Sequence, residues 1–216
     1  MTAETKTGWY LPEAAHPYYE FVKAGFEIEF GSPAGGNPPL DADSIEATKE
    51  DEECVSFLND EGIQAKLASS HKLSDLVEAG ESFNAIFTVG GFGVMWDLPN
   101  DAALQTLYRT TYESGSGIAA AVCHGPAALT NVTLSDGSYL VAGKEVTGFS
   151  NEEEHAVSRF DIVPWTCENK LAERGATYSA AAAWGENVKS DSRVVTGQNP
   201  ASARACAQAV IAALSE

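Results

Sequence analysis

The residues best suited to chemistry in this chain are Cys123 and His124, which lie in the segment GIAAAVCHGPAAL (117–129). Small and apolar residues surround the cysteine, a pattern typical of a sharp turn between a buried strand and a helix. Small neighbours are needed there because the backbone of a nucleophile on such a turn is strained. The helix N-terminus is expected to lower the pKa of the thiol, and a thiolate attacks carbonyl carbon. The alternative is a buried structural cysteine, since free cysteines are among the most buried residues.

The elements around this motif are predicted to alternate between buried strands and amphipathic helices. Apolar runs of strand length cover 84–91 and 117–122, and residues 101–115 have the spacing of an amphipathic helix that ends at a glycine. This alternation predicts a mostly parallel sheet covered by helices on both faces. Further strands are predicted over 25–30, 138–143, 144–149 and 186–197, helices over 12–25, 124–132, 152–160, 167–175 and 200–214, and a broken helical stretch over 44–76 with one helix ending at Gly62 and another starting within 72–80.

Size and composition indicate one globular domain over residues 1–216. The chain is long enough to bury a substantial core, and 44% hydrophobic with 20% charged residues is ordinary for a folded protein. No apolar run approaches the ~20 residues of a membrane span, and the N-terminal residues lack the pattern of a signal peptide. We therefore expect a cytoplasmic protein with no membrane partner.

Acidic residues dominate the charged ones. The chain has 31 Asp and Glu against 13 Lys and Arg, for a formal net charge of -18. Phosphate backbones would be repelled, which argues against nucleic acid as a partner. The acids are spread along the chain and are interpreted as a solvated surface, in an ordinary cytoplasm or in a salt-rich one.

The four cysteines and four histidines form no spaced motif. No CxxC pair occurs, so neither a zinc site nor a disulfide framework is predicted, and the cysteines are interpreted as free thiols in a reducing compartment. We expect no metal and no other cofactor. The residues are Cys54, Cys123, Cys167, Cys206, His16, His71, His124 and His155.

Four ordered motifs resemble the ThiJ/PfpI superfamily, in its branch of glutathione-independent glyoxalases and heat-inducible chaperones. They are AAAVCHGPAAL (119–129), GG-x-G-x-MWDLP (90–99), VTGFSNEEE (146–154) and TGQNPASA (196–203), and the resemblance covers nearly the whole chain from Thr7 onward. It implies an α/β fold, a flavodoxin-like three-layer sandwich with a nucleophile elbow at Cys123, usually in a homodimer. It also implies a glyoxalase III-type lyase of the D-lactate dehydratase class, which converts methylglyoxal to lactate without a metal or added cofactor.

The resemblance also implies roles for two glutamates. Glu13, in TGWYLPEAAHP (7–17), would be the proton-transferring carboxylate beside the nucleophile, and Glu154 would orient His124 in a Cys-His-Glu set. Each has a structural alternative, because each lies in the first turn of a predicted helix, where acidic residues are favourable. For Glu154, Ser150 is the predicted N-cap of that helix.

The backbone around the nucleophile is expected to supply donors for a developing oxyanion. Glycine-lined loops and helix N-termini present N–H groups at close range. Within the GG-x-G loop, a phenylalanine stands where the family often has a histidine, which makes the pocket more apolar; it is either a hydrophobic plug or a determinant of substrate choice. The candidate substrate-binding and oxyanion-binding residues are Gly90, Gly91, Phe92 and Gly125.

An expected strand is missing from the pattern. A sheet of this kind ordinarily begins with an apolar strand in its middle that leads into Glu13, and the seven residues before Gly8 are unsuited to form one. Without a replacement for that strand, Glu13 is expected to be poorly placed and the activity weakened.

Two other function classes remain open. A hydrolase or deglycase would use the same cysteine for acyl transfer, although glutaminase-type members carry an H-x-E pair that this sequence lacks. A stress chaperone or redox sensor would use an exposed apolar patch, to which Phe92 and Trp96 contribute, or oxidation of Cys123.

Overall fold

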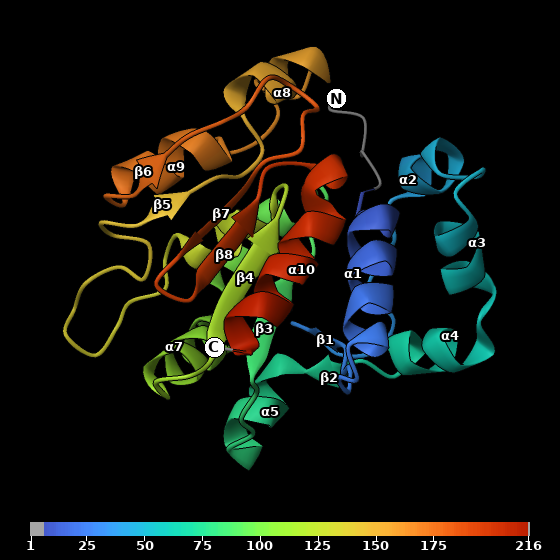
Figure 1. Ribbon diagram of the computed structural model, residues 1–216, viewed down its shortest axis with the longest axis horizontal. Coiled ribbons are helices and arrows are strands. Elements are labelled where there is room, and N and C mark those ends of the chain that lie inside the picture. Colours follow the sequence, from blue (N-terminus) through green and yellow to red (C-terminus); the bar gives the residue numbers. More distant parts are fainter. Residues whose placement is uncertain (1–6, 216) are drawn as a thin grey trace.

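A four-stranded sheet forms the centre of the molecule in the computed structural model, which describes residues 7–215. The strand order is β3–β4–β8–β7; the first three strands are parallel, and β7 pairs antiparallel with β8 (Figure 1). The register places Ala85 opposite Ile118 and Ala119 opposite Val194. The strands are β3 (Ala85–Thr88), β4 (Ile118–Val122), β7 (Val188–Asp191) and β8 (Val194–Gly197).

Helices cover both faces of this sheet. α10 (Ala203–Leu214) packs on β4 and β8, and α1 (Leu11–Lys23) lies beside it (Figure 1). α7 (Ala102–Glu113) packs on the opposite face. Successive side chains of a strand point to opposite faces, so each strand can contribute to both helix layers. Within β4, residues 118 and 120 contact the α10 layer and residues 119 and 121 the α7 layer. The predicted three-layer α/β arrangement is therefore confirmed.

The remaining elements lie around this sandwich. β1 pairs with β2 and β5 with β6, both parallel and each outside the main sheet. Their bounds are β1 (Gly31–Ser32), α2 (Ala42–Ala47), α3 (Glu52–Asn59), α4 (Glu61–Ala68), β2 (His71–Lys72), α5 (Leu73–Ala79), α6 (Val94–Asp97), η1 (Leu98–Asn100), η2 (Gly125–Leu129), β5 (Glu145–Val146), α8 (Asn151–Ala156), α9 (Cys167–Glu173), β6 (Thr177–Tyr178) and η3 (Pro200–Ser202).

Four details of the prediction were wrong. Residues 26–30 form no strand, because a strand needs a hydrogen-bonded neighbour and β3, at the edge of the sheet, pairs only with β4. Residues 138–143 form turns rather than a strand, and Gly62 lies inside α4 instead of ending a helix. The helix expected over 124–132 is the short 3₁₀ helix η2.

The start of α1 is held in place without a preceding strand in the part of the chain from residue 7 onward. Trp9 donates its N–H to the oxygen of Pro39 at 3.0 Å, and Asp41 donates to the oxygen of Trp9 at 2.9 Å. Tyr10 donates to the oxygen of Gly90, also at 3.0 Å. These bonds fix the segment that leads into α1 against the GG-x-G loop, and Glu13 at the start of that helix is buried next to Cys123. The question of a strand over residues 1–6 lies outside the described residues.

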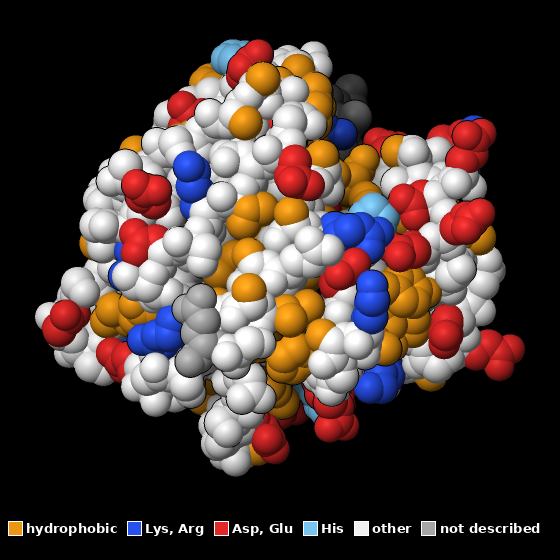
Figure 2. All heavy atoms as spheres, viewed as in Figure 1, with side chains coloured by type: hydrophobic (Ala, Val, Ile, Leu, Met, Phe, Trp, Pro, Cys, Tyr) orange, Lys and Arg blue, Asp and Glu red, His pale blue; other side chains and the backbone are white. Residues whose placement is uncertain are grey.

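The surface carries its acidic side chains in scattered positions. Figure 2 shows red carboxylates over much of the visible face, with the densest group around α2, α3 and α4. This distribution agrees with a solvated acidic surface rather than a single acidic tail. Among the described helices, none has the length and apolar character needed to span a bilayer.

Candidate active site

Cys123 lies on a strained turn directly after the central strand β4. Its φ angle is 61°, in the left-handed region that a residue with a side chain rarely adopts. The turn is held by two backbone hydrogen bonds: the Cys123 N–H donates to the oxygen of Gly197 at 2.9 Å, and its carbonyl accepts from Phe149 at 2.8 Å. Strain of this kind persists only where the surroundings enforce it, and it is typical of functional sites. The predicted elbow is confirmed.

Glu13 and Cys123 both pack against Gly90. The glutamate is fully buried at the start of α1. A Cβ atom built on Gly90 would lie 2.4 Å from one Glu13 carboxyl oxygen and 2.9 Å from Cβ of Cys123. Glycine is therefore required at position 90 by close approach, because the Glu13 carboxyl and the Cys123 side chain both approach the place that a Cβ would occupy.

Replacement of Gly90 tests this packing. We expect Gly90→Ala to displace the Glu13 carboxyl and to lower kcat/KM for the reaction proposed below by ~10-fold or more, with a stability loss of about 1–3 kcal/mol from overpacking. Gly62→Ala is the matched control, because Gly62 lies in an exposed helix turn. Steady-state kinetics together with thermal unfolding of both variants measure the effects. Unchanged kinetics in Gly90→Ala would mean that the close approach has no catalytic consequence.

The Glu13 carboxyl has an unusual electrostatic environment. Neither of its oxygens makes a hydrogen bond to a described residue, and a buried polar group without a partner costs several kcal/mol. Burial raises the pKa of Glu13 to about 8, and the nearby Cys123 thiol and the Gly90 N–H only partly oppose that rise. A carboxyl whose pKa lies near neutrality is suited to both giving and taking a proton.

The expectation of a lowered thiol pKa was wrong for this conformation. Burial, and then the negative charge of Glu13, raise the pKa of Cys123 well above its ordinary value. The predicted α-helix that would oppose this effect is replaced by the short η2. Because each negative charge disfavours the other, the Cys123–Glu13 pair carries at most one charge near neutral pH.

His124 links the thiol to Glu154. Its Nδ1 lies 3.4 Å from Cys123 Sγ, and its Nε2 lies 2.7 Å from Glu154 Oε1. All three side chains are almost completely buried. With Nε2–H donating to the carboxylate, Nδ1 is left to accept the thiol proton. The structure thus places Glu154 where the resemblance implies it.

Two neighbouring glutamates have different hydrogen-bond partners. Glu153 forms a capping box with Ser150, the predicted N-cap, and also accepts from the N–H of Trp184. Glu154 turns the other way, toward the imidazole. The structural reading of this acidic turn therefore holds for Glu153 and not for Glu154.

We expect Glu154→Gln to lower kcat/KM by roughly 10²-fold or more, because an amide no longer fixes the tautomer and orientation of His124. Glu153→Gln is the matched control: it should change the melting temperature while the kinetics of the folded protein stay near those of the parent. Kinetics and thermal unfolding of both variants check this. Equal losses of activity would show that the two positions act only through stability.

Aromatic rings enclose the imidazole of His124. The ring centroids of Phe92 and Phe149 lie 4.5 Å and 4.3 Å from that of His124. Trp184 packs on Phe149, and the guanidinium of Arg159 lies 4.5 Å from the centre of Phe92. Phe92 is thus a packing residue for the imidazole of His124. Sequence reasoning missed Phe149 and Trp184, whose only signal was their aromatic character.

Tyr10 is a further residue that sequence reasoning missed. Burial, and then the charges of Glu13 and Cys123, raise its pKa to about 12, so its phenol stays protonated beside the site. In the sequence, only its position directly before the helix that carries Glu13 could have indicated that Tyr10 lies near the site.

The other glycines predicted to bind an oxyanion are explained first by space. Gly91 has a φ of 108°, and a Cβ there would lie 2.3 Å from the oxygen of Gly8. At Gly125, a Cβ would lie 2.4 Å from the oxygen of Thr88. Their role as donors to substrate stays a prediction.

A cysteine on a strained turn after the central strand of an α/β sandwich, beside a histidine and a buried carboxyl, places the chain among α/β proteins with a nucleophile elbow. The chain belongs to the DJ-1/PfpI family, whose family model matches residues 8–213. The resemblance drawn from the four sequence motifs is thereby confirmed, together with the flavodoxin-like fold it implies.

Several relatives match nearly the whole chain. Glyoxalase 3 of Candida albicans is 35% identical over 216 residues, which cover 96% of this chain and 90% of that protein. A glutathione-independent glyoxalase of Saccharomyces cerevisiae is 33% identical over 219 residues, covering 97% and 90%. The solved structure of Rapid Encystment Protein 24 KDa of Francisella tularensis has a TM-score of 0.91 at 40% identity and covers 99% of this chain and 92% of its own. That of glyoxalase III from Candida albicans has a TM-score of 0.86 at 35% identity, covering 96% and 88%.

Proposed function

We propose that this chain is a glutathione-independent glyoxalase that converts an α-ketoaldehyde such as methylglyoxal to the α-hydroxyacid lactate. The observation that carries this proposal is the Glu13 carboxyl, which is buried against Cys123 without a hydrogen-bond partner. The similarity to glyoxalases of two yeasts over nearly the whole chain supports it.

The site favours a very small substrate. Cys123 is 4% exposed and Glu13 is 0% exposed, so only a compact carbonyl compound reaches both groups without a large rearrangement. The aromatic rings of Phe92 and Phe149 beside His124 make the surroundings apolar, which suits a methyl-substituted aldehyde.

The first step is addition of the thiol to the aldehyde carbon. A bond forms between Cys123 Sγ and that carbon, and the thiol proton passes through Nδ1 of His124 to the aldehyde oxygen. The product is a hemithioacetal, and no oxidant is consumed. The 3.4 Å between Sγ and Nδ1 is the path for this proton.

The second step moves hydrogen between adjacent carbons. The Glu13 carboxylate takes the proton from the former aldehyde carbon, and the resulting enediolate receives that proton at the neighbouring carbon, while His124 moves the hydroxyl proton to the other oxygen. One carbon is oxidised as its neighbour is reduced. The phenol of Tyr10 and the N–H groups of the GG-x-G loop are the donors available to the enediolate oxygen.

The third step releases the product. The lactoyl thioester on Cys123 is attacked by water, His124 takes a proton from that water, and lactate leaves as the thiol is restored. The overall reaction consumes one water per α-ketoaldehyde. The Cys123–His124–Glu154 arrangement is the one that acyl-transfer enzymes use.

This third step also defines the second candidate function. An acyl-transfer hydrolase or deglycase would need the thiol, His124 and Glu154, but would not need a carboxyl that carries a proton between carbons. Glu13 therefore distinguishes the two: its replacement by glutamine abolishes the glyoxalase reaction and leaves hydrolysis of a small thioester largely intact.

The direct test is incubation of purified protein with methylglyoxal alone, with D- and L-lactate measured separately. We expect formation of one lactate enantiomer without glutathione. In deuterated water, a proton that stays on the buried Glu13 returns to the substrate, so the new C–H bond is expected to retain a measurable share of protium. Absence of lactate at protein concentrations comparable to substrate would refute the proposal.

A further inference from the structure

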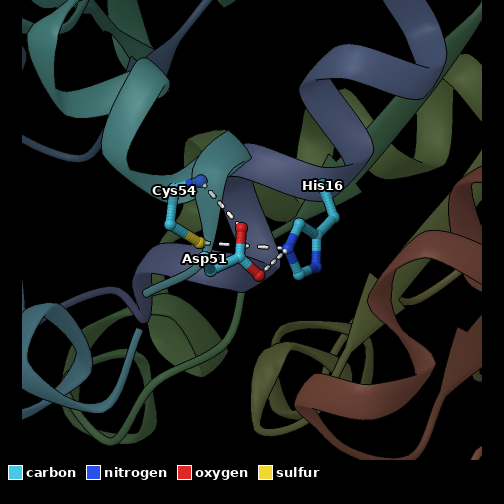
Figure 3. Close-up of side chains that lie close together, drawn as sticks. All are labelled: His16, Asp51 and Cys54. Carbon is cyan, nitrogen blue, oxygen red and sulfur yellow. Dashed lines mark hydrogen bonds and ion pairs between the residues drawn. The ribbon is translucent and has the colours of Figure 1, made fainter. Parts of the chain in front are cut away.

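Outside the active site, His16, Asp51 and Cys54 bring three metal-ligating side chains together (Figure 3). His16 lies on α1, Asp51 is the N-cap of α3, and Cys54 lies in the first turn of α3. One ligand atom from each lies within 4.8 Å of the other two. The sequence prediction of no metal site was based on spacing along the chain alone. His16 and Asp51 are too distant in sequence to form a spaced motif, so that criterion does not detect this group.

The imidazole faces the carboxylate and the sulfur through the same nitrogen. His16 Nε2 lies 2.9 Å from Asp51 Oδ2 and 3.9 Å from Cys54 Sγ. A proton relay would contact its two partners through different ring nitrogens, as His124 does. Three ligand atoms that converge on one point are instead the arrangement around a cation. In a tetrahedral zinc site, ordinary bond lengths place nitrogen and oxygen roughly 3.4 Å apart, and sulfur and nitrogen roughly 3.6 Å apart.

The carboxylate is already oriented for this role. Oδ1 of Asp51 accepts the N–H groups of Glu53 and Cys54 at 3.1 Å and 3.0 Å, which leaves Oδ2 directed at the imidazole. Bonds that hold a ligand oxygen in place are typical of metal sites.

The site combines a buried sulfur with solvent access. Cys54 is fully buried, whereas the side chains of His16 and Asp51 are 18% and 33% exposed. A cation therefore enters from the side of the carboxylate, where water completes its coordination. Sulfur and imidazole donors select zinc and similar ions over magnesium or calcium, and the acidic surface attracts divalent cations.

We propose that His16, Asp51 and Cys54 bind a divalent transition-metal ion of the zinc class. Binding forms one bond to each residue and releases the thiol proton of Cys54 to solvent; no electron is transferred. The ion joins α1 to α3, and α1 also carries Glu13, so the site stabilises the helix that positions the active-site carboxyl.

Cobalt is a suitable probe, because a thiolate bound to Co²⁺ produces charge-transfer absorption in the near ultraviolet, and tetrahedral Co²⁺ gives intense visible bands. The full chain with Cys123→Ser, which removes the active-site thiol, is titrated with cobalt chloride. We expect both absorptions to saturate at one ion per chain, and excess zinc chloride to abolish them. Proton release on zinc addition, measured in weakly buffered solution, provides a second readout.

Variants in the same parent locate the ion. Cys54→Ala should eliminate the near-ultraviolet band, and Asp51→Asn, which keeps the helix cap, should weaken cobalt binding by ~10-fold or more. His71→Ala is the control, because His71 pairs with Glu29 at 3.2 Å and no described cysteine completes that pair into a three-ligand group. The proposal is overturned if the parent shows no charge-transfer band, if the band survives in Cys54→Ala, or if His71→Ala weakens binding as much as Asp51→Asn. Should Cys54→Ala fail to fold, Cys54→Ser and Asp51→Asn decide the question.

Discussion

Replacing Cys123 by alanine should abolish lactate formation from methylglyoxal, with kcat/KM falling by roughly 10⁴-fold or more. The thiol forms the covalent bond to the aldehyde, and it lies 3.4 Å from the imidazole of His124, whereas the neighbouring Cys167 thiol contacts the backbone oxygen of His124 at 3.6 Å. The loss should appear in kcat rather than in thermal stability, because the backbone hydrogen bonds that hold the turn at position 123 do not involve the thiol and remain in the alanine variant. Steady-state kinetics and thermal unfolding of the purified variant measure the two effects separately.

Cys206→Ala is the matched control for this substitution. Cys206 is equally buried, it packs in the apolar cluster on the α10 side of the sheet, and its Sγ donates a hydrogen bond to the oxygen of Ala121 at 3.6 Å. Its removal should cost about 1 kcal/mol of stability and leave the rate within about twofold of the parent. Residual activity above about a tenth of the parent in Cys123→Ala would refute the covalent mechanism and favour a structural role for that cysteine.

Replacing Glu13 by glutamine should lower kcat/KM by roughly 10²–10⁴-fold, because an amide does not carry a proton between the two carbons. The pH profile of the parent should identify the group. Glu13 acts as a base, so kcat/KM should rise with pH and level off above the pKa of about 8. The glutamine variant should lose this rise together with the rate. A parent rate that is independent of pH between about 6 and 9 would contradict the role of Glu13.

The same substitution should change how stability depends on pH. The folded-state pKa of Glu13, about 8, lies above its ordinary value of 4.5, so between these two pH values the folded protein holds a proton that the unfolded chain gives up. Raising the pH from about 4.5 to about 8 therefore favours unfolding, by as much as about 5 kcal/mol from this group alone. Glu13→Gln should remove this decline. Unfolding in denaturant at several pH values measures it.

Glu20→Gln on the same helix is the control with the opposite sign. Hydrogen bonds from Gln208 and Arg204 lower the pKa of Glu20, so its contribution to stability is present at neutral pH and is lost as the pH falls. Its replacement should leave catalysis unchanged. A decline with rising pH that persists in Glu13→Gln but disappears in Glu20→Gln would show that the pKa of Glu13 has been assigned to the wrong residue.

Local sequence was sufficient for the elbow and for the layers around it. The run Ile118–Val122 has no polar side chain, so it is buried wherever the chain folds, and the small residues after it permit the turn at Cys123. The amphipathic spacing of α7 and α10 likewise depends on nearby residues only. Residues 26–30 are the counterexample: their pattern favours a strand, but a strand is completed by a partner that is distant in sequence, and β3 lies at the edge of the main sheet.

The chemistry of the site was decided by tertiary structure. Sequence indicated the thiol and the adjacent imidazole, whereas only folding places Glu154 at 2.7 Å from that imidazole and buries Glu13 against Gly90 without a partner. The ligand atoms of His16, Asp51 and Cys54 are likewise brought together only by folding, because these residues come from two helices and belong to no common sequence motif. Side-chain type and local spacing are properties of a short stretch of chain, but burial, pKa and ligand geometry depend on which distant residues exclude water from one another.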